Sequence, residues 1–227
     1  MKKIVILTGA GMSAESGIKT FRDSNGLWEG HDVMEVASLE GYENNPKLVL
    51  EFYNQRRKQL KEVSPNEGHY NLVHLEKSYD TTIITQNVDD LHERAGSKNI
   101  IHLHGELRKV RSSFDSSLIY HWEEDLFIGD FCEKKSQLRP HIVWFGEAVP
   151  MFDRAVEIVK KTDILVIIGT SMQVYPAASL IDFIQSNVPI YFIDPKPNFQ
   201  EIRYSNLEII KKGAVEGTAL LLKKLVY

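Results

Sequence analysis

Two histidines one residue apart, His102 and His104, lie in the stretch NIIHLHG and are the first candidates for chemistry. Residues i and i+2 of a strand share a face, so the pair could form half of a metal site. The further ligands would have to be His121, Asp115 or Cys132, folding back from an irregular segment. A single imidazole with an unperturbed pKa of about 6.5 is mostly neutral at pH 7 and could instead act as a general base. A buried structural histidine is the third interpretation.

A second polar group, Gln86, Asn87 and Asp89, follows the apolar run TTIIT. In an extended backbone Asn87 and Asp89 lie on one face, where their side chains could hold an amide and a ribose hydroxyl together. Either residue could equally cap the N-terminus of a helix.

Two glycine-containing loops also follow apolar runs. GAGMSA begins at Gly9, and its glycines would allow a tight turn and a close approach of Gly11 to a pyrophosphate at a helix N-terminus. No second strand ends in an acidic residue about twenty positions later, so this is not the ordinary dehydrogenase arrangement. GTS, which begins at Gly169, offers small donors for phosphate or ribose. Each loop taken alone could be a simple capped turn.

Strand-like and helical segments alternate around these loops. Near-continuous apolar runs, KIVILT, TTIITQ, NIIHLH, HIVWF, DILVIIGT and PIYFIDP, alternate with helical patterns such as PMFDRAVEIVKK and PAASLIDFIQS. Such runs are typical of a parallel sheet covered on both faces, which predicts a doubly wound α/β fold. Residues 31–66, which contain the helical pattern PKLVLEFYNQRRKQLKEV, and the irregular residues 107–139 interrupt the alternation. We expect them to form a smaller inserted module, with a ligand cleft between the two parts.

Composition limits the class of protein. The 227 residues are 43% hydrophobic and 26% charged with a net charge of −4, which is typical of a globular protein and gives no basic field for nucleic acid. A single cysteine excludes an internal disulfide and favours a reducing compartment. The first apolar run is too short for a signal peptide or a membrane span. We therefore expect a cytoplasmic protein without nucleic-acid or membrane partners.

Six motifs in order, GAGxS with AESGI, TFR, TQNxDxLH, HLHG, RPHIVWFGE and GTS, together resemble the sirtuins, the NAD-dependent protein lysine deacylases. The resemblance extends from residue 4 to about residue 194. It implies a Rossmann-like NAD-binding domain, here residues 1–30, 67–106 and 140–227, with the inserted module described above. NAD and an acylated lysine of a protein or peptide would meet in the cleft.

The resemblance also implies roles for individual residues. His104 would remove a proton from a ribose hydroxyl, and Asn87 and Asp89 would help to expose the glycosidic carbon, so that the products are nicotinamide, free lysine and O-acyl-ADP-ribose. His102 is expected to be structural. The implied cofactor-binding residues are Gly9, Ala10, Gly11, Ser13, Phe21, Arg22, Gln86, Asn87, Asp89, Gly169, Thr170, Ser171, Asp194, Gly213 and Ala214. The implied peptide-binding residues are Val143, Phe145, Gly146 and Glu147.

Two features bear on the branch of the family. Tyr53 and Arg56 are three residues apart on an expected helix, and sirtuins that prefer succinyl and malonyl groups carry such a pair to bind the acyl carboxylate. Alternatively, Arg56 belongs to a solvated face with Arg57 and Lys58. Two further hypotheses use the same motifs: mono-ADP-ribosyl transfer or NAD hydrolysis, and a non-catalytic module that binds NAD or acyl-lysine.

Sirtuins typically bind a structural zinc through two cysteine pairs in the inserted module, whereas residues 107–139 offer only Cys132. A closed zinc site needs four good ligands, so we expect no metal. Packing must then hold the module together. The expected apolar residues are Phe114, Leu118, Ile119, Tyr120, Trp122, Leu126, Phe127 and Phe131.

Overall fold

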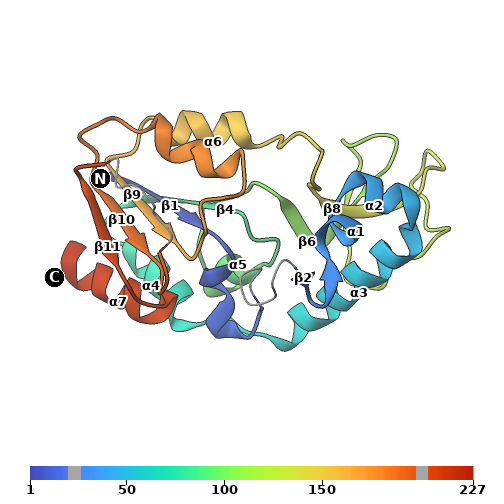
Figure 1. Ribbon diagram of the computed structural model, residues 1–227, viewed down its shortest axis with the longest axis horizontal. Coiled ribbons are helices and arrows are strands. Elements are labelled where there is room, and N and C mark those ends of the chain that lie inside the picture. Colours follow the sequence, from blue (N-terminus) through green and yellow to red (C-terminus); the bar gives the residue numbers. More distant parts are fainter. Residues whose placement is uncertain (20–26, 198–203, 227) are drawn as a thin grey trace.

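A six-stranded parallel sheet forms the larger part of the protein (Figure 1). The computed structural model describes residues 1–19, 27–197 and 204–226. The sheet has the order β11-β10-β9-β1-β4-β5, and every neighbouring pair is parallel. Its strands are β1 (Lys3–Thr8), β4 (Asp80–Thr85), β5 (Ile100–His102), β9 (Ile164–Ile168), β10 (Ile190–Ile193) and β11 (Leu207–Ile210). The predicted doubly wound α/β fold is confirmed.

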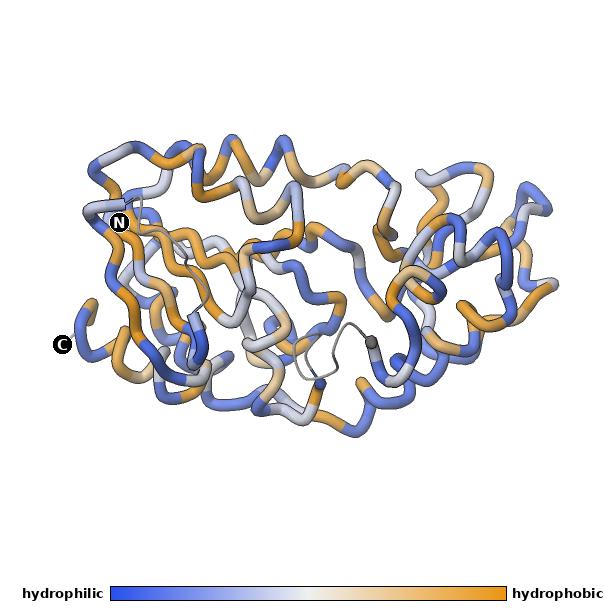
Figure 2. The backbone as a smooth tube through the Cα atoms, viewed as in Figure 1, coloured by the Kyte–Doolittle hydropathy of each residue, from blue (hydrophilic) through white to orange (hydrophobic). Residues whose placement is uncertain are grey.

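Helices cover both faces of this sheet, which explains why its strands are apolar on both sides. On one face, α4 (Glu67–Leu75) and α7 (Ala214–Leu225) pack against β1, β4 and β9. On the other face lie α6 (Phe152–Val159) and the 3-10 helix η4 (Ala177–Phe183). Figure 2 shows the strands between these layers as largely hydrophobic. Of the helices in the described residues, none is both long and apolar enough to cross a membrane.

The strand order places a topological switch point beside β1. From β1 the sheet extends through β4 to β5 on one side and through β9 and β10 to β11 on the other. Ligands of open α/β sheets bind at such a point, outside the carboxyl ends of the strands. The short elements at this edge are η1 (Ala10–Met12), η2 (Ala14–Ser16) and α5 (Leu91–Ala95).

The smaller module lies beyond the carboxyl edge of the sheet, on the right in Figure 1. Its three-stranded antiparallel sheet has the order β7-β6-β8, formed by β6 (Gly105–Ser112), β7 (Ile119–His121) and β8 (Leu138–Ile142). The hairpin β2 (Leu27–Trp28) and β3 (His31–Asp32) leads into α1 (Val33–Val36), α2 (Leu39–Asn44) and α3 (Pro46–Glu62). The domain boundaries predicted from the sequence stay a prediction.

One predicted strand belongs to the other sheet. The run HIVWF was expected among the apolar strands of the parallel sheet, but its first two residues end β8, which pairs antiparallel with β6. Apolar content alone cannot distinguish the two sheets, because β8 is buried at four of its five residues, as a strand of the parallel sheet would be.

The core of the inserted module also differs from the expectation. Leu126 is buried there, and Leu118, Tyr120 and Trp122 pack against it, as expected. Four other expected core residues are instead well exposed, namely Phe114 (80%), Ile119 (43%), Phe127 (57%) and Phe131 (59%). Their places are filled from distant segments, by Leu50, Val110, Cys132 and Leu138. The Cys132 thiol lies 3.4 Å from the Ser112 hydroxyl, so the lone cysteine contributes as a small buried side chain.

Candidate active site

Residues from five predicted motifs follow five strands at the carboxyl edge of the parallel sheet. These are Gly9 after β1, Gln86 after β4, His104 after β5, Gly169 after β9 and Asp194 after β10. Hydrogen bonds connect the loops: Gln86 Nε2 donates to Thr170 Oγ1 over 3.1 Å, and Asn87 Nδ2 donates to the Gly9 carbonyl over 3.1 Å. The fold therefore gathers motifs that are up to 185 residues apart, from residue 9 to residue 194.

The first glycine loop is pressed against the loop after β9. The Gly11 amide donates to the Gly169 carbonyl over 2.8 Å, and a Cβ atom on Gly11 would lie 2.6 Å from the Gly169 Cα. Gly169 itself has φ +61, which favours glycine. The loop was expected to open a helix, with Gly11 allowing backbone N–H groups to approach a pyrophosphate. The segment instead forms two three-residue 3-10 turns, and the Gly11 amide is hydrogen-bonded to the loop after β9.

Ser13, Asn87 and Asp89 form a buried polar cluster between the segment after β1 and the loop after β4. The Ser13 hydroxyl donates to Asp89 Oδ2 over 2.9 Å and accepts from Asn87 Nδ2 at 3.2 Å. The Leu91 amide donates to Asp89 Oδ1 over 3.1 Å. The N-cap of α5 is Asp90, so neither Asn87 nor Asp89 is the helix cap considered from the sequence. Burial raises the pKa of the Asp89 carboxyl, and these hydrogen bonds oppose that shift. Asn87 and Asp89 are thus fixed in one orientation before any ligand binds.

The two histidines contact consecutive backbone carbonyls, and their pKa values are shifted in opposite directions. His104 Nδ1 lies 3.1 Å from the Gln86 carbonyl, which can only accept, so this nitrogen carries the proton and Nε2 keeps its lone pair. Burial lowers the pKa of His104, which favours the neutral base. His102 Nδ1 lies 3.3 Å from the Asn87 carbonyl, and its Nε2 lies 2.6 Å from Glu93 Oε1. Burial lowers the pKa of His102, but the contacts with Glu93 outweigh it, so the net shift is upward.

The two-histidine metal site considered from the sequence is not assembled. Among the described residues, the one group of three or more side chains close enough to share an ion is Glu93, His102 and Glu106. It does not include His104. The other ligands considered lie elsewhere: His121 pairs with Glu123, Asp115 pairs with Lys134, and Cys132 is buried in the module core.

The remaining residues predicted to bind the cofactor lie on the β9, β10 and α7 side of the edge. Asp194 is buried and its Oδ1 accepts from the Lys196 amide over 2.8 Å. Thr170 is buried and Ser171 is partly exposed beside it. Gly213 precedes α7, where Glu15 Oε2 accepts from the Val215 amide over 2.9 Å, and the Ala214 side chain packs into the sheet core. Phe21 and Arg22 lie outside the described residues.

The predicted peptide-binding segment crosses from β8 back toward the large sheet. The Val143 amide donates to the His104 carbonyl over 2.9 Å, and the Phe145 amide donates to the Ala37 carbonyl over 2.8 Å. Phe145 and Gly146 are exposed. The Glu147 carboxylate points instead to two arginines, 2.7 Å from Arg139 and 3.0 Å from Arg111. Through these ion pairs Glu147 anchors the segment.

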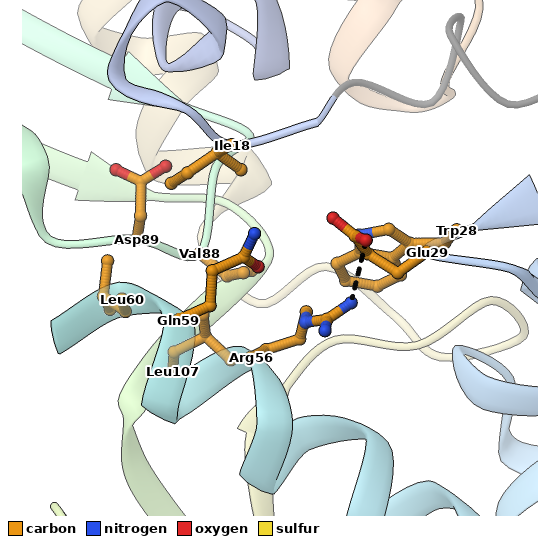
Figure 3. Close-up of a pocket in the computed structure, with 9 residues that line it drawn as sticks. All are labelled: Ile18, Trp28, Glu29, Arg56, Gln59, Leu60, Val88, Asp89 and Leu107. Carbon is orange, nitrogen blue, oxygen red and sulfur yellow. Dashed lines mark ion pairs between the residues drawn. The ribbon is translucent and has the colours of Figure 1, made fainter. Parts of the chain in front are cut away.

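A cavity opens between α3, the hairpin β2–β3 and the loop after β4 (Figure 3). Asp89 stands at one end and Arg56 at the other. Arg56 Nη1 is 3.8 Å from Glu29 Oε2, and neither its Nε nor its Nη1 has a hydrogen-bond partner in the described part of the chain. Burial lowers the pKa of Arg56, and Glu29 opposes that shift. The lining residues are Ile18, Trp28, Glu29, Arg56, Gln59, Leu60, Val88, Asp89 and Leu107.

The structure separates Tyr53, Arg57 and Lys58 of the same helix from this cavity. Tyr53 is fully buried among aromatic rings, its hydroxyl accepts from Trp144 Nε1 over 3.0 Å, and it is not among the lining side chains. The solvated-face alternative is wrong for Arg57, which is buried and donates to the Leu107 and Glu124 carbonyls. Only Lys58 fits that alternative, with 59% of its side chain exposed.

A sequence model of the Sir2 family matches residues 9–176. The chain belongs to the Sir2 family. It is 59% identical over 226 residues to an NAD-dependent protein deacylase of Helicobacter pylori, covering 100% of this chain and 98% of that protein. It is 53% identical over 232 residues to an NAD-dependent protein deacylase of Bacteroides thetaiotaomicron, covering 100% and 99%. Among solved structures, the complex of a Sir2 homologue with NAD matches with a TM-score of 0.88 at 38% identity, covering 98% of this chain and 89% of the other.

The motifs in the sequence identified most of the polar residues at the sheet edge. They did not identify one charged residue in the cavity, Glu29. Glu29 lies in the cavity beside Arg56, and nothing in its surroundings GLWEGHD marked it. Its place depends on the hairpin β2–β3 folding over α3. No local pattern could have predicted that contact.

Proposed function

We propose that this protein is an NAD-dependent protein deacylase that removes acetyl groups, and also succinyl and malonyl groups, from lysine side chains. The products would be nicotinamide, free lysine and an O-acyl-ADP-ribose. Membership in the Sir2 family and the names of the similar proteins support NAD-dependent deacylation. The observation that carries the preference for acidic acyl groups is Arg56, whose Nε and Nη1 are buried beside the cavity without described acceptors.

The donor set at the sheet edge fits NAD. The two glycine loops contact each other closely at Gly9, Gly11 and Gly169. Buried polar side chains surround this edge of the sheet. We assign Gly9, Ala10, Gly11 and Ser13 to the pyrophosphate side, with Phe21 and Arg22 on the covering loop. Thr170, Ser171 and Gly169 would contact the phosphates and ribose, Asp194 the adenosine ribose, and Gly213 and Ala214 the adenine. The Asp194 carboxylate suits ribose hydroxyls, as in many dinucleotide-binding folds.

When bound, NAD supplies the ribose carbon to which the acyl oxygen becomes attached as nicotinamide leaves. The chain's own part is orientation and proton transfer. Gln86, Asn87 and Asp89 would hold the nicotinamide and its ribose, and the hydrogen bonds that fix Asn87 and Asp89 before binding reduce the reorganisation needed.

His104 would accept the ribose hydroxyl proton at Nε2. Its Nδ1 proton is held by the Gln86 carbonyl, so the neutral ring presents a lone pair at Nε2. Because burial lowers the pKa of His104, the ring stays unprotonated over a wider pH range than a free histidine. His102, one strand position away, stays outside this proton transfer and holds the Asn87 carbonyl.

The peptide would add as an extended strand along residues 143–147. The Val143 and Phe145 amides and the Phe145 carbonyl are hydrogen-bonded within the protein, so the partly exposed Val143 and the exposed Gly146 would offer the backbone groups for pairing. Glu147 anchors the segment through Arg139 and Arg111. Strand addition gives affinity through backbone hydrogen bonds with little sequence selection. This arrangement suits an enzyme that acts on lysines in many sequence contexts.

Arg56 would bind the carboxylate of a succinyl or malonyl group. A guanidinium can hold a carboxylate with two N–H donors along its Nε–Nη2 edge or its Nη1–Nη2 edge, and each of these edges of Arg56 carries one donor, Nε or Nη1, without a described acceptor. Each hydrogen bond to a charged group contributes about 1.5–3 kcal/mol, enough for a preference of ten- to hundredfold. Tyr53, on the same helix, is fully buried and does not line the cavity, so its part would be to hold α3 through the hydrogen bond from Trp144.

The test compares acetyl, malonyl and succinyl versions of one lysine peptide with NAD, following free lysine and O-acyl-ADP-ribose by mass spectrometry. Arg56→Met should lose desuccinylation and retain deacetylation. Lys58→Met is the matched control, because it removes an exposed cation of the same helix, and it should leave the succinyl-to-acetyl ratio unchanged. Equal loss of both activities in Arg56→Met would refute the acyl-carboxylate assignment.

A further inference from the structure

Glu29 places a second carboxylate in the cavity where Arg56 would meet an acidic acyl group. It lies at the turn between β2 and β3, with a backbone φ of +50 and 13% of its side chain exposed. Its Oε2 is 3.8 Å from Arg56 Nη1 and 3.1 Å from Lys19 Nζ. Figure 3 shows the Glu29 carboxylate directed toward the guanidinium across the cavity.

Glu29 forms an ion pair with Arg56 but no hydrogen bond. At 3.8 Å the two groups form an ion pair, but the separation is too long for a hydrogen bond. Glu29 therefore compensates the buried positive charge of Arg56 while Nε and Nη1 remain without a described acceptor. A carboxylate that reached the guanidinium directly would bond one of these two donors, along the Nε–Nη2 edge or the Nη1–Nη2 edge, and Glu29 would then be a like charge beside it.

We propose that Glu29 is an internal counter-carboxylate that sets the acyl selectivity of this protein, competing with acidic acyl groups for Arg56. This inference rests on the proposed function of Arg56. With a neutral acetyl group in the cavity, Glu29 keeps Arg56 charge-paired. When a succinyl group enters, Glu29 turns away from the guanidinium and keeps its ion pair with Lys19, whose side chain is 65% exposed and free to follow it.

Removing the Glu29 charge should therefore favour acidic acyl groups. In Glu29→Gln we expect the ratio of kcat/KM for a succinyl peptide to kcat/KM for the matching acetyl peptide to rise about tenfold, which corresponds to about 1.4 kcal/mol. The rise should come from a lower KM for the succinyl peptide, because the competing charge acts on binding. Glu29→Gly is a second variant without a side chain that could bond Arg56, and the positive φ of this position suits glycine.

Glu35→Gln is the matched control, because it removes an exposed carboxylate six residues along the same module. Its ratio should equal that of the unaltered protein. An unchanged ratio in both Glu29 variants, with Arg56→Met still losing desuccinylation selectively, would overturn the role of Glu29 and leave the proposed function intact. If Arg56→Met lowers both activities equally, the proposed function fails, and the role of Glu29 fails with it.

Discussion

Gly105, which directly follows His104, occupies a position that only glycine can fill. Its φ is +86, and a Cβ atom built on it would lie 2.0 Å from the His141 carbonyl oxygen on the neighbouring strand β8. The same short segment carries the His104 carbonyl, which accepts from the Val143 amide over 2.9 Å. An alanine here must therefore push β8 and β6 apart at the point where His104 is positioned.

Two effects, backbone strain and overpacking, determine the expected loss of stability. A left-handed backbone costs an L-residue with a side chain roughly 1–2 kcal/mol, and overpacking typically adds about 1–3 kcal/mol. Gly105→Ala should therefore lower the free energy of unfolding by about 2–5 kcal/mol. At about 2–4 °C per kcal/mol for a chain of this size, its melting temperature should fall by roughly 4–20 °C.

Gly96→Ala separates the two effects. Gly96 has φ +107, but no described atom lies within 4 Å of a Cβ built there. This variant should therefore lose stability only through its left-handed backbone. Its melting temperature should fall by about 2–8 °C. Scanning calorimetry gives the two melting temperatures, and deacylation assayed well below them gives kcat/KM. We expect kcat/KM to fall more than tenfold in Gly105→Ala and to change little in Gly96→Ala. Equal melting temperatures and equal activities would refute the steric argument.

Three further predictions concern proton transfer, helix anchoring and metal content. The acid limb of the pH profile of kcat/KM should have its midpoint below 6.5, because burial lowers the pKa of His104 and activity is lost only as the pH falls through that lowered value; a midpoint at or above 6.5 would contradict this. Arg57→Met should lower the free energy of unfolding in urea by about 3 kcal/mol, because it leaves the buried Leu107 carbonyl without its donor, whereas Lys58→Met should change it by less than about 0.5 kcal/mol. The purified protein should contain far less than one zinc per chain, and a chelator should leave its melting temperature unchanged, since the module core is apolar packing around one cysteine; near-stoichiometric zinc would show that this account of the module is wrong.

Much of the fold was predictable because it depends on local patterns. The apolar runs at residues 3–8 and 163–170 became β1 and β9, and both pack against helices on two faces. The alternation of such strands with helices indicated a parallel sheet, and parallel strands bring the loops that follow them to one edge. For this reason the motifs that begin at Gly9, Gln86 and Gly169 could be expected to meet.

The inserted module was less predictable because its contacts are not local. Phe114 and Phe127 are as apolar as any core residue, yet both are exposed, while Leu50 from α3 and Val110 from β6 fill the core. Which of these side chains is buried depends on how α3 packs against the antiparallel sheet. The pattern of hydrophobic residues along the chain does not predict that packing.

The sequence by itself determined the family, five of the six strands of the parallel sheet and the set of polar residues at its edge, since these follow from residue type and spacing. Only the tertiary structure decided what neighbouring residues of the same type do. His102 and His104 differ because one faces Glu93 and the other only a backbone carbonyl. Arg56 and Arg57 differ because one lines a cavity opposite Glu29 and the other is enclosed by carbonyl groups. The pKa of a group and the availability of a donor depend on partners brought from distant segments, and those partners exist only in the folded chain.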